Sequence, residues 1–346
     1  TVDFSGTDSV TGTGIGTDKL DGVEVVQTGS GDDEFTGSAG NDTFFGGAGA
    51  DTFHGTSGAD ILNGEGDADV FKGASVLGND TFIGGVGIDT ADYSSDSDDL
   101  IVDFSGTDSV TGTGIGTDKL DGVEVVKTGA GDDELTGSAG NDTFFGGTGA
   151  DTFYGTSGAD ILYGEGGADV FKGADATGND TFIGGSASGF DTVDYSSDND
   201  DLIVNFSGTD SVTGTGIGTD KLDGIEVVNL GAGDDTFING ASNDTISAGG
   251  GKDVADYDAE TADMTYNLAT GAVAGAGADV LNGFEVYLSG SGADTFIAHD
   301  VAANNTLNGG TGTDTADYSS DADDLVVDFS GTDVVSGSGI GTDTLN

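Results

Sequence analysis

Aspartate side chains recur along this chain every nine residues, and this spacing is the feature of the sequence best suited to chemistry. Asp42, Asp51 and Asp60 are three successive examples. Each is the sixth residue of a nonapeptide with the pattern G-G-x-G-x-D-x-U-x, where U is a large apolar residue, as in GGAGADTFH at 46–54. Carboxylate oxygens and the main-chain carbonyls of glycine-rich turns are the ligands that Ca²⁺ prefers. The repeated aspartates are therefore candidate metal ligands.

Twenty nonapeptides fall into four blocks, with seven, seven, three and three copies. Two copies depart from the pattern, because Asn305 replaces the sixth-position aspartate and Asp67 replaces a glycine. If the aspartates of repeats n and n+2 share one cation, the chain binds about twelve Ca²⁺ ions. The predicted metal ligands are Asp33, Asp42, Asp51, Asp60, Asp69, Asp80, Asp89, Asp133, Asp142, Asp151, Asp160, Asp169, Asp180, Asp191, Asp235, Asp244, Asp253, Asp294 and Asp314.

The same nine residues predict the elements that position these aspartates. The first six are glycine-rich and acidic, which suits a tight turn, and the last three suit a short strand. Two nonapeptides then make one coil of 18 residues, and successive coils stack their strands in parallel about 4.8 Å apart. The eighth residue of each repeat, such as Phe44 or Phe53, points inward. We expect an all-β fold, a parallel β-roll (β-solenoid) with 18 residues per coil and calcium ions in its turns.

Spacers of about 35 residues separate the blocks, and residues 1–85 match residues 101–185 at 74 of 85 positions. A spacer could be an inserted antiparallel subdomain or a degenerate continuation of the roll, and the spacing of its apolar residues favours continuation into one solenoid. Asp108 and Asp118 keep the G-x-D-x-U core and are further candidate ligands. The expected organisation is spacer coils at 1–27, 93–127, 195–229, 257–288 and 318–346, and nonapeptide blocks at 28–92, 128–194, 230–256 and 289–317.

The charge of the chain limits its partners. With 64 acidic and 7 basic side chains, the net charge is −57, and the resulting self-repulsion requires bound cations. Nucleic acid and anionic membrane surfaces are excluded as partners, because both need clustered Lys and Arg. No apolar run approaches the roughly 20 residues that span a bilayer, so membrane insertion is not expected. We expect the acidic run at 96–99 to be a solvated surface.

Catalysis is not expected. His54 occupies the ninth, outward position of its repeat, and His299 has no partner carboxylate at a recognisable spacing. Paired carboxylates are abundant, but they recur with the repeat, whereas an active site should appear once and in an irregular place. The chain contains no Cys, and it starts at Thr1 without a signal peptide, which favours a segment of a longer protein.

The nonapeptides resemble the RTX, or haemolysin-type calcium-binding, repeats of proteins exported by Gram-negative bacteria. The resemblance covers roughly 190 residues directly. It implies Ca²⁺ as the bound ion, export as an unfolded chain through a type I channel, and folding outside the cell at millimolar calcium. It also implies that the protein is secreted or lies on the surface of a Gram-negative cell.

Two functions remain open. The first is a structural or adhesive rod that forms part of a matrix, surface layer, filament or giant adhesin. The second is the RTX secretion and folding region of a type I-exported hydrolase or toxin. Residues 1–20 and 326–345 are versions of one spacer stretch, so copies of the chain are candidate partners, end to end or side by side.

Overall fold

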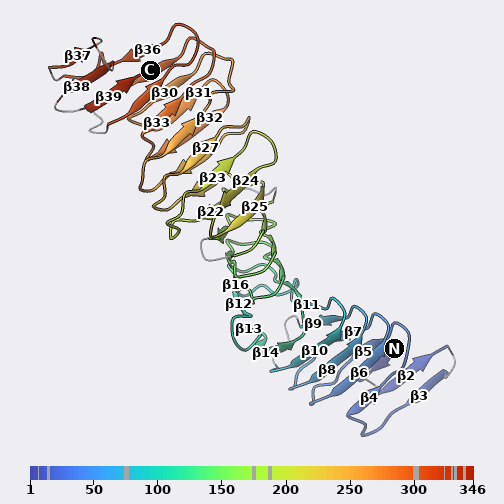
Figure 1. Cartoon of the computed structure of the whole chain (residues 1–346). Coiled ribbons are helices and arrows are strands. Elements are labelled where there is room, and N and C mark those ends of the chain that lie inside the picture. Colours follow the sequence, from blue (N-terminus) through green and yellow to red (C-terminus); the bar gives the residue numbers. More distant parts are fainter. Residues whose placement is uncertain are drawn as a thin grey trace. The chain divides into compact units, whose positions relative to one another are not determined.

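The structure is a computed structural model that describes residues 1–6, 8–13, 16–73, 78–173, 177–185, 189–298, 304–322, 324–328, 330, 333–337 and 340–346. In these residues all regular elements are β-strands (Figure 1). None of the described segments forms a helix long and apolar enough to cross a membrane. The chain divides into two compact units, residues 1–171 with 180–191, and residues 172–179 with 192–346.

The first unit contains two ladders of short parallel strands. One ladder runs in the order β1 (Val2–Asp3), β5 (Glu34–Thr36), β7 (Thr52–His54), β9 (Val70–Lys72), β11 (Thr90–Asp92), β15 (Val125–Lys127), β17 (Thr143–Phe145), β19 (Ile161–Tyr163) and β21 (Thr181–Ile183). The other contains β4 (Val25–Gln27), β6 (Thr43–Ala48), β8 (Ile61–Gly66), β10 (Thr81–Val86), β14 (Gly116–Asp121), β13 (Ser109–Gly112), β12 (Leu100–Asp103), β16 (Glu134–Thr136) and β18 (Thr152–Tyr154). Strands β2 (Ser9–Gly12) and β3 (Gly16–Lys19) form antiparallel hairpins at the start of the chain, and β20 spans Val170–Lys172.

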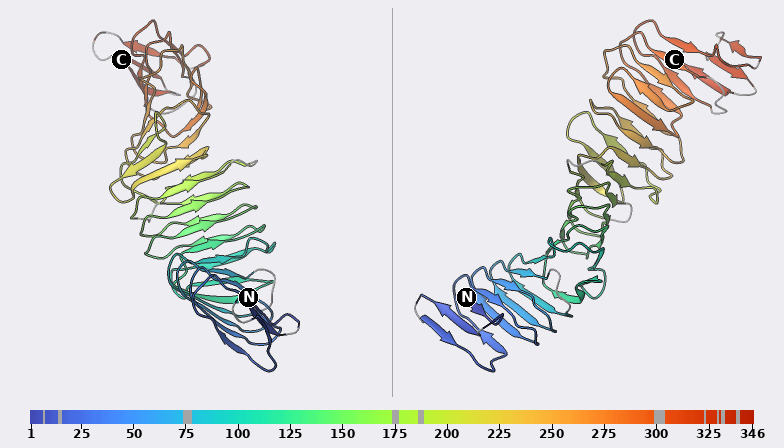
Figure 2. Two further views of the ribbon diagram at one scale, coloured as in Figure 1. Left: turned by 90° about the vertical axis from the view of Figure 1, so that its right-hand side faces the viewer. Right: turned by 180° about the vertical axis from the view of Figure 1, so that it is seen from behind.

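The second unit repeats this design. Its first ladder contains β25 (Gly218–Asp223), β24 (Ser211–Gly214), β23 (Ile203–Asn205), β27 (Thr236–Ile238), β29 (Val254–Asp256), β33 (Val286–Leu288), β35 (Thr306–Asn308), β39 (Gly341–Leu345), β38 (Val334–Gly337) and β37 (Val326–Asp328). Its second contains β22 (Thr192–Asp194), β26 (Val227–Asn229), β28 (Thr245–Ser247), β32 (Ala278–Asn282), β31 (Ala272–Ala274), β30 (Thr265–Asn267), β34 (Thr295–Ile297) and β36 (Thr315–Asp317). The stacking of successive coils within each unit can be followed in Figure 2.

A column of eighth-position side chains forms the core, as expected. Phe35, Phe53 and Phe71 are fully buried, and their rings stack with centroids 4.7 and 5.0 Å apart. The outer residues of each three-residue strand are only partly buried, because side chains alternate between the two faces of a strand. The predicted parallel β-roll is confirmed.

The length of a coil varies more than the sequence suggested. Hydrogen bonds from a backbone N–H to a carboxylate Oδ1 link equivalent aspartates 18 residues apart in uninterrupted repeats and 20 or 22 apart across an insertion. The bond from Asp80 to Asp118, which lies within the spacer at 93–127, spans 38 residues. In this spacer β14 pairs in parallel with β10, while β13 is antiparallel to both β12 and β14. The spacer therefore continues the parallel ladder through β14 and also contains an antiparallel insertion at β13.

The expectation of a solvated acidic run at 96–99 is wrong for its first residue. Asp96 is 5% exposed, and its Oδ1 accepts a hydrogen bond from the backbone N–H of Asp98. The turn that leads from Tyr93 into β12 encloses Asp96, whereas Asp98 and Asp99 are exposed.

Candidate metal centres

Within each block, the sixth-position aspartates stack into two columns, one beside each ladder of strands. Asp69 Oδ1 accepts a hydrogen bond of 2.8 Å from the backbone N–H of Asp51, the equivalent residue one coil earlier. Asp60 Oδ1 accepts one of 2.9 Å from the backbone N–H of Asp42 in the same way. Since each coil holds two nonapeptides, repeats of odd and even number supply separate columns.

We call these the first column and the second column. The first column contains Asp33, Asp51, Asp69 and Asp89 in block 1, Asp133, Asp151, Asp169 and Asp191 in block 2, Asp235 and Asp253 in block 3, and Asp294 and Asp314 in block 4. The second contains Asp42, Asp60 and Asp80, then Asp142, Asp160 and Asp180, then Asp244, with Asn305 in block 4. The structure thus brings the predicted ligands together as neighbours n and n+2.

Nearly all of these carboxylates are buried. Asp51, Asp69 and Asp60 are 1–2% exposed, whereas Asp33 is half-buried and Asp314 is exposed. Among the described residues no group of three or more acidic or histidine side chains forms a ready cage for a metal ion. A cation in these turns would therefore need main-chain carbonyl oxygens as well as carboxylates, which is within the preference of Ca²⁺.

Among the described residues, eight carboxylates of the first column leave one oxygen without a hydrogen-bond partner, whereas Asp294 Oδ2 accepts the Ser289 hydroxyl at 2.7 Å. The buried Oδ2 atoms of these eight accept no hydrogen bond, and burying a charged oxygen in this way is costly. The clearest cases are Asp51, Asp69, Asp89, Asp151, Asp169, Asp235 and Asp253. Burial raises the pKa of Asp69 and of Asp151 to about 7, with smaller contributions from neighbouring carboxylates.

These unpaired oxygens face the turn and approach a carbonyl oxygen of the next coil. A methyl group added to Gly64, the first residue of its repeat, would collide with Asp69 Oδ2 and lie 2.9 Å from the carbonyl oxygen of Gly84. A methyl group on Gly164 would meet Asp169 Oδ2 and lie 2.9 Å from the carbonyl oxygen of Gly184. A carboxylate and a carbonyl oxygen thus converge on the same point, and this donor set fits Ca²⁺.

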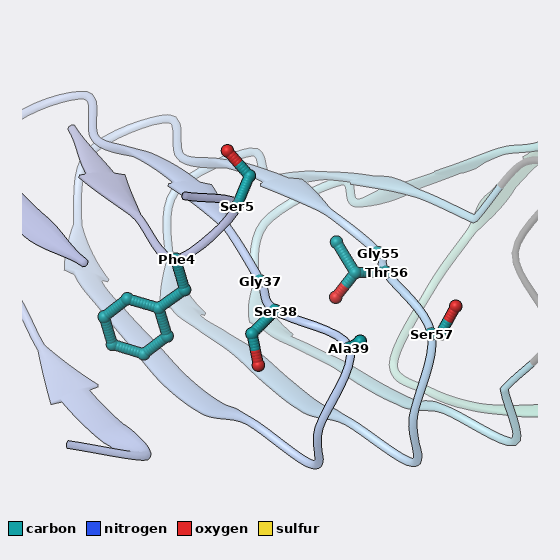
Figure 3. A pocket seen from close by; sticks show the side chains of 8 residues that line it. All are labelled: Phe4, Ser5, Gly37, Ser38, Ala39, Gly55, Thr56 and Ser57. Carbon is teal, nitrogen blue, oxygen red and sulfur yellow. The ribbon is translucent and has the colours of Figure 1, made fainter. Parts of the chain in front are cut away.

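Several carboxylates of the second column have a different environment, because nearby groups donate to their Oδ2 atoms. Asp42 Oδ2 accepts hydrogen bonds from the Ser38 backbone N–H at 2.6 Å and from the Ser38 hydroxyl at 3.1 Å. Asp142 and Asp244 are paired with serine hydroxyls in the same way. Figure 3 shows Ser38 and Thr56 on successive turns beside a hollow of about 340 Å³.

The spacers contribute four buried aspartates that sequence reasoning did not identify as a set. Each continues the second column or its equivalent, and each accepts a hydrogen bond from a buried or part-buried tyrosine hydroxyl. The pairs are Tyr93–Asp118 at 2.9 Å, Tyr195–Asp220 at 2.6 Å, Tyr257–Asp279 at 2.7 Å and Tyr318–Asp343 at 2.7 Å. The recurring tyrosine and the recurring G-T-D or G-A-D were visible in the sequence, but 22 to 25 residues separate the partners. Only the fold brings them together.

The other sequence candidates are the two spacer aspartates and the histidines. Asp118, one of the two spacer candidates, is 1% exposed, and its Oδ1 accepts the backbone N–H of Asp80. Asp108 is half-buried, with its backbone in the left-handed region at φ 27°. His54 lies at the end of β7 and contacts Glu34 at 3.1 Å on the surface. His299 lies outside the described residues.

Comparison with known protein families identifies the repeats independently. The family model of the RTX calcium-binding nonapeptide repeat matches residues 20–53, 45–75, 77–91, 120–153, 145–176, 154–193 and 218–256. These segments together cover more than half of the chain. No curated protein matches the chain. The family that the sequence resembled is thus confirmed.

Proposed function

Because the chain belongs to the RTX calcium-binding nonapeptide repeat family, we propose that it is a structural or adhesive segment that works outside the cell and folds when it binds Ca²⁺. The observation that carries this proposal is the series of buried carboxylates in the first column, whose Oδ2 atoms have no hydrogen-bond partner. The family binds calcium, and a cation beside these buried oxygens would offset the cost of burying their charge.

Charge is the physical reason for coupling folding to calcium. The net charge of −57 opposes any compact state, and many of the carboxylates are buried in the turns. Breaking a buried ion pair by removing one partner is strongly destabilising, because the remaining charge is uncompensated. A site that forms only in the folded chain makes the free energy of metal binding part of the free energy of folding. In the cytoplasm, where free calcium is scarce, the chain would then stay unfolded.

The repetitive design supports a structural role. The buried acidic groups recur in block after block, and the 100-residue copies differ at only a few positions. A chain of this kind gains length and surface with each copy, and the stability of a repeat array is approximately the sum of its units and their interfaces. We propose export through a type I channel of a Gram-negative bacterium and assembly with copies of itself. No residue is assigned a catalytic role.

Circular dichroism of the purified chain tests the calcium mechanism. We expect a β spectrum in millimolar calcium, cooperative loss of this spectrum on addition of EGTA, and its return when calcium is restored. Magnesium at the same concentration is the control, because Mg²⁺ dehydrates reluctantly and demands octahedral geometry. An unchanged β spectrum in EGTA would refute calcium-dependent folding.

Electron microscopy of the calcium-loaded chain tests the structural role. We expect filaments, layers or end-to-end assemblies. Discrete particles that do not associate at any concentration would instead favour the second function, the folding region of an exported hydrolase or toxin.

A further inference from the structure

We propose that the two kinds of turn within each block are not equivalent: Ca²⁺ binds along the first column, and the second column is closed by hydroxyl groups and takes up no ion. The first column lies beside the ladder of β5 and β7 in block 1 and beside the ladder of β16 and β18 in block 2, so the difference follows the repeat and not one edge of the roll. This inference rests on the proposed function, because it concerns where calcium binds within a calcium-dependent roll. It lowers the expected number of ions from about twelve to between six and eight.

The second residue of each nonapeptide distinguishes the two columns. In first-column turns after the first of each block, this residue has a left-handed backbone, with φ between 67° and 118°, at Gly47, Glu65, Gly85, Gly147, Glu165, Gly185 and Gly249. The turn that starts each block differs, because Gly29, Gly129, Gly231 and Gly290 at this position are not left-handed. In second-column turns the same position holds Ser38, Thr56, Ser138 and Thr156, none of which has a positive φ. Since residues with a β-carbon disfavour the left-handed region, serine or threonine at this position selects the other turn.

Two first-column turns adopt the left-handed conformation even without glycine at the second position. Glu65 and Glu165 adopt φ values of 71° and 67°, although neither is glycine. A non-glycine residue in this region carries strain, and strain of this kind concentrates at ligand sites. Both glutamates lie in turns whose aspartates, Asp69 and Asp169, have a fully buried Oδ2 without a partner.

The turn conformation decides whether the aspartate is already satisfied. With serine at the second position, the backbone N–H and the hydroxyl of Ser38 both point to Asp42 Oδ2, and Ser138 does the same for Asp142. With the left-handed Glu65 or Glu165 there, no N–H or hydroxyl reaches Oδ2 of Asp69 or Asp169. Six described turns combine a left-handed second residue with an unpaired, fully buried Oδ2, namely those of Asp51, Asp69, Asp89, Asp151, Asp169 and Asp253.

The space beside the first residue of the turn also differs between the columns. In the first column, the point beside Gly64 lies between Asp69 Oδ2 and the carbonyl oxygen of Gly84. In the second column, the hydroxyl of Thr56 fills the equivalent point beside Gly37, and the ring of Tyr93 fills it beside Gly73. The oxygens that a cation requires are present beside Gly64, and protein atoms occupy their place beside Gly37 and Gly73. Gly55 is intermediate, because the Lys72 carbonyl oxygen and Asp80 Oδ2 lie 3.1 and 3.6 Å from the equivalent point.

The end of each column continues this difference. Asp89 donates its backbone N–H to Glu124 Oε2, and Asp253 donates to Glu285 Oε2, so a further carboxylate terminates the first column. The second column ends on Asp118 or Asp279, whose Oδ2 accepts a tyrosine hydroxyl. Asp133 and Asp235, which start the first column in their blocks, also have an unpaired Oδ2 and set the upper limit of eight ions.

A matched pair of variants tests the inference in the full chain. Asp69 and Asp60 lie in adjacent repeats, are 1% and 2% exposed, and each accepts one backbone N–H through Oδ1, from Asp51 and Asp42 respectively. Asp69→Asn and Asp60→Asn each remove one negative charge and keep that acceptor. Equilibrium dialysis with radioactive calcium counts the ions bound per chain, and circular dichroism in calcium establishes that both variants fold. Asp169→Asn and Asp160→Asn repeat the comparison in block 2.

We expect Asp69→Asn to lose at least one ion and Asp60→Asn to lose none. An equal loss in the two variants would overturn the difference between columns and leave calcium-dependent folding intact. A wild-type chain that binds no calcium would refute the proposed function itself. If Asp69→Asn does not fold, the ion count of Asp60→Asn decides the question. A wild-type count supports the inference, and loss of an ion overturns it.

Discussion

Asp69 in a nonapeptide turn and Asp118 in a spacer are almost the same site, and they differ in one partner. Both are 1% exposed, both accept a backbone N–H through Oδ1, and burial raises the pKa of each to about 7. Asp118 Oδ2 accepts the hydroxyl of Tyr93, whereas Asp69 Oδ2 has no partner. The protein therefore supplies a donor to one buried carboxylate from its own side chain, and a cation would compensate the other under the proposed function.

This difference divides the stability of the chain into two parts. The tyrosine pairs contribute at any calcium concentration, because they need no ligand. The first-column turns contribute only when the ion is bound.

Calcium should have the largest effect. A ligand that binds only the folded state adds about 2.7 kcal/mol per site when its free concentration is 100 times its Kd. With several sites, we expect the unfolding temperature measured by scanning calorimetry to rise steeply with calcium concentration. A midpoint that does not depend on calcium would contradict the account.

Gly64→Ala should have the next largest effect, since the new methyl group would collide with Asp69 Oδ2 in the first column. We expect the loss of one calcium ion and of at least the roughly 2.7 kcal/mol that this ion supplies, measured by titration calorimetry and by denaturation in calcium. Gly55→Ala is the matched control at the same turn position of the second column, where the nearest atom would be the Lys72 carbonyl oxygen at 3.1 Å. Loss of an ion in Gly55→Ala would indicate that the second column also binds calcium.

Tyr93→Phe should have a smaller effect that does not depend on calcium. It leaves Asp118 Oδ2 buried without its donor, which costs about 1–3 kcal/mol. We expect the same loss in the free energy of unfolding at low and high calcium, with an unchanged number of bound ions. Tyr163→Phe is the control, because the Tyr163 ring stacks on Phe145 on the outer face of the sheet. A calcium-dependent loss in Tyr93→Phe would mean that Tyr93 acts at a metal site.

His54→Ala should have the smallest effect. Its contact with Glu34 is on the surface, and exposed ion pairs contribute at most about 1 kcal/mol. We expect denaturation in calcium to give the wild-type midpoint within error. A large loss would point to a role for His54 beyond its outward place in β7.

Much of this arrangement could be predicted from the sequence, because the nine-residue period leaves little choice. It places Phe44 and Phe53 inside and stacks Asp51 on Asp69, and the structure has both. The sequence also shows a hydroxyl at Ser38 and Thr56. Whether that hydroxyl affects the nearby aspartate depends on the φ angle of the second residue, and the pattern G-G-x-G-x-D-x-U-x does not distinguish turns by this angle. The nine-residue period is interrupted in the spacers. The antiparallel strand β13 and the pairing of Tyr93 with Asp118 therefore could not be derived from spacing.

The number of calcium ions bound per chain at saturation tests the central claim most directly. Metal analysis of the calcium-loaded chain after gel filtration gives this number without any variant. The account predicts six to eight ions, all in the first column. A value near twelve would show that both columns bind calcium, and the difference between Asp69 and the second-column carboxylates would then have no bearing on metal binding.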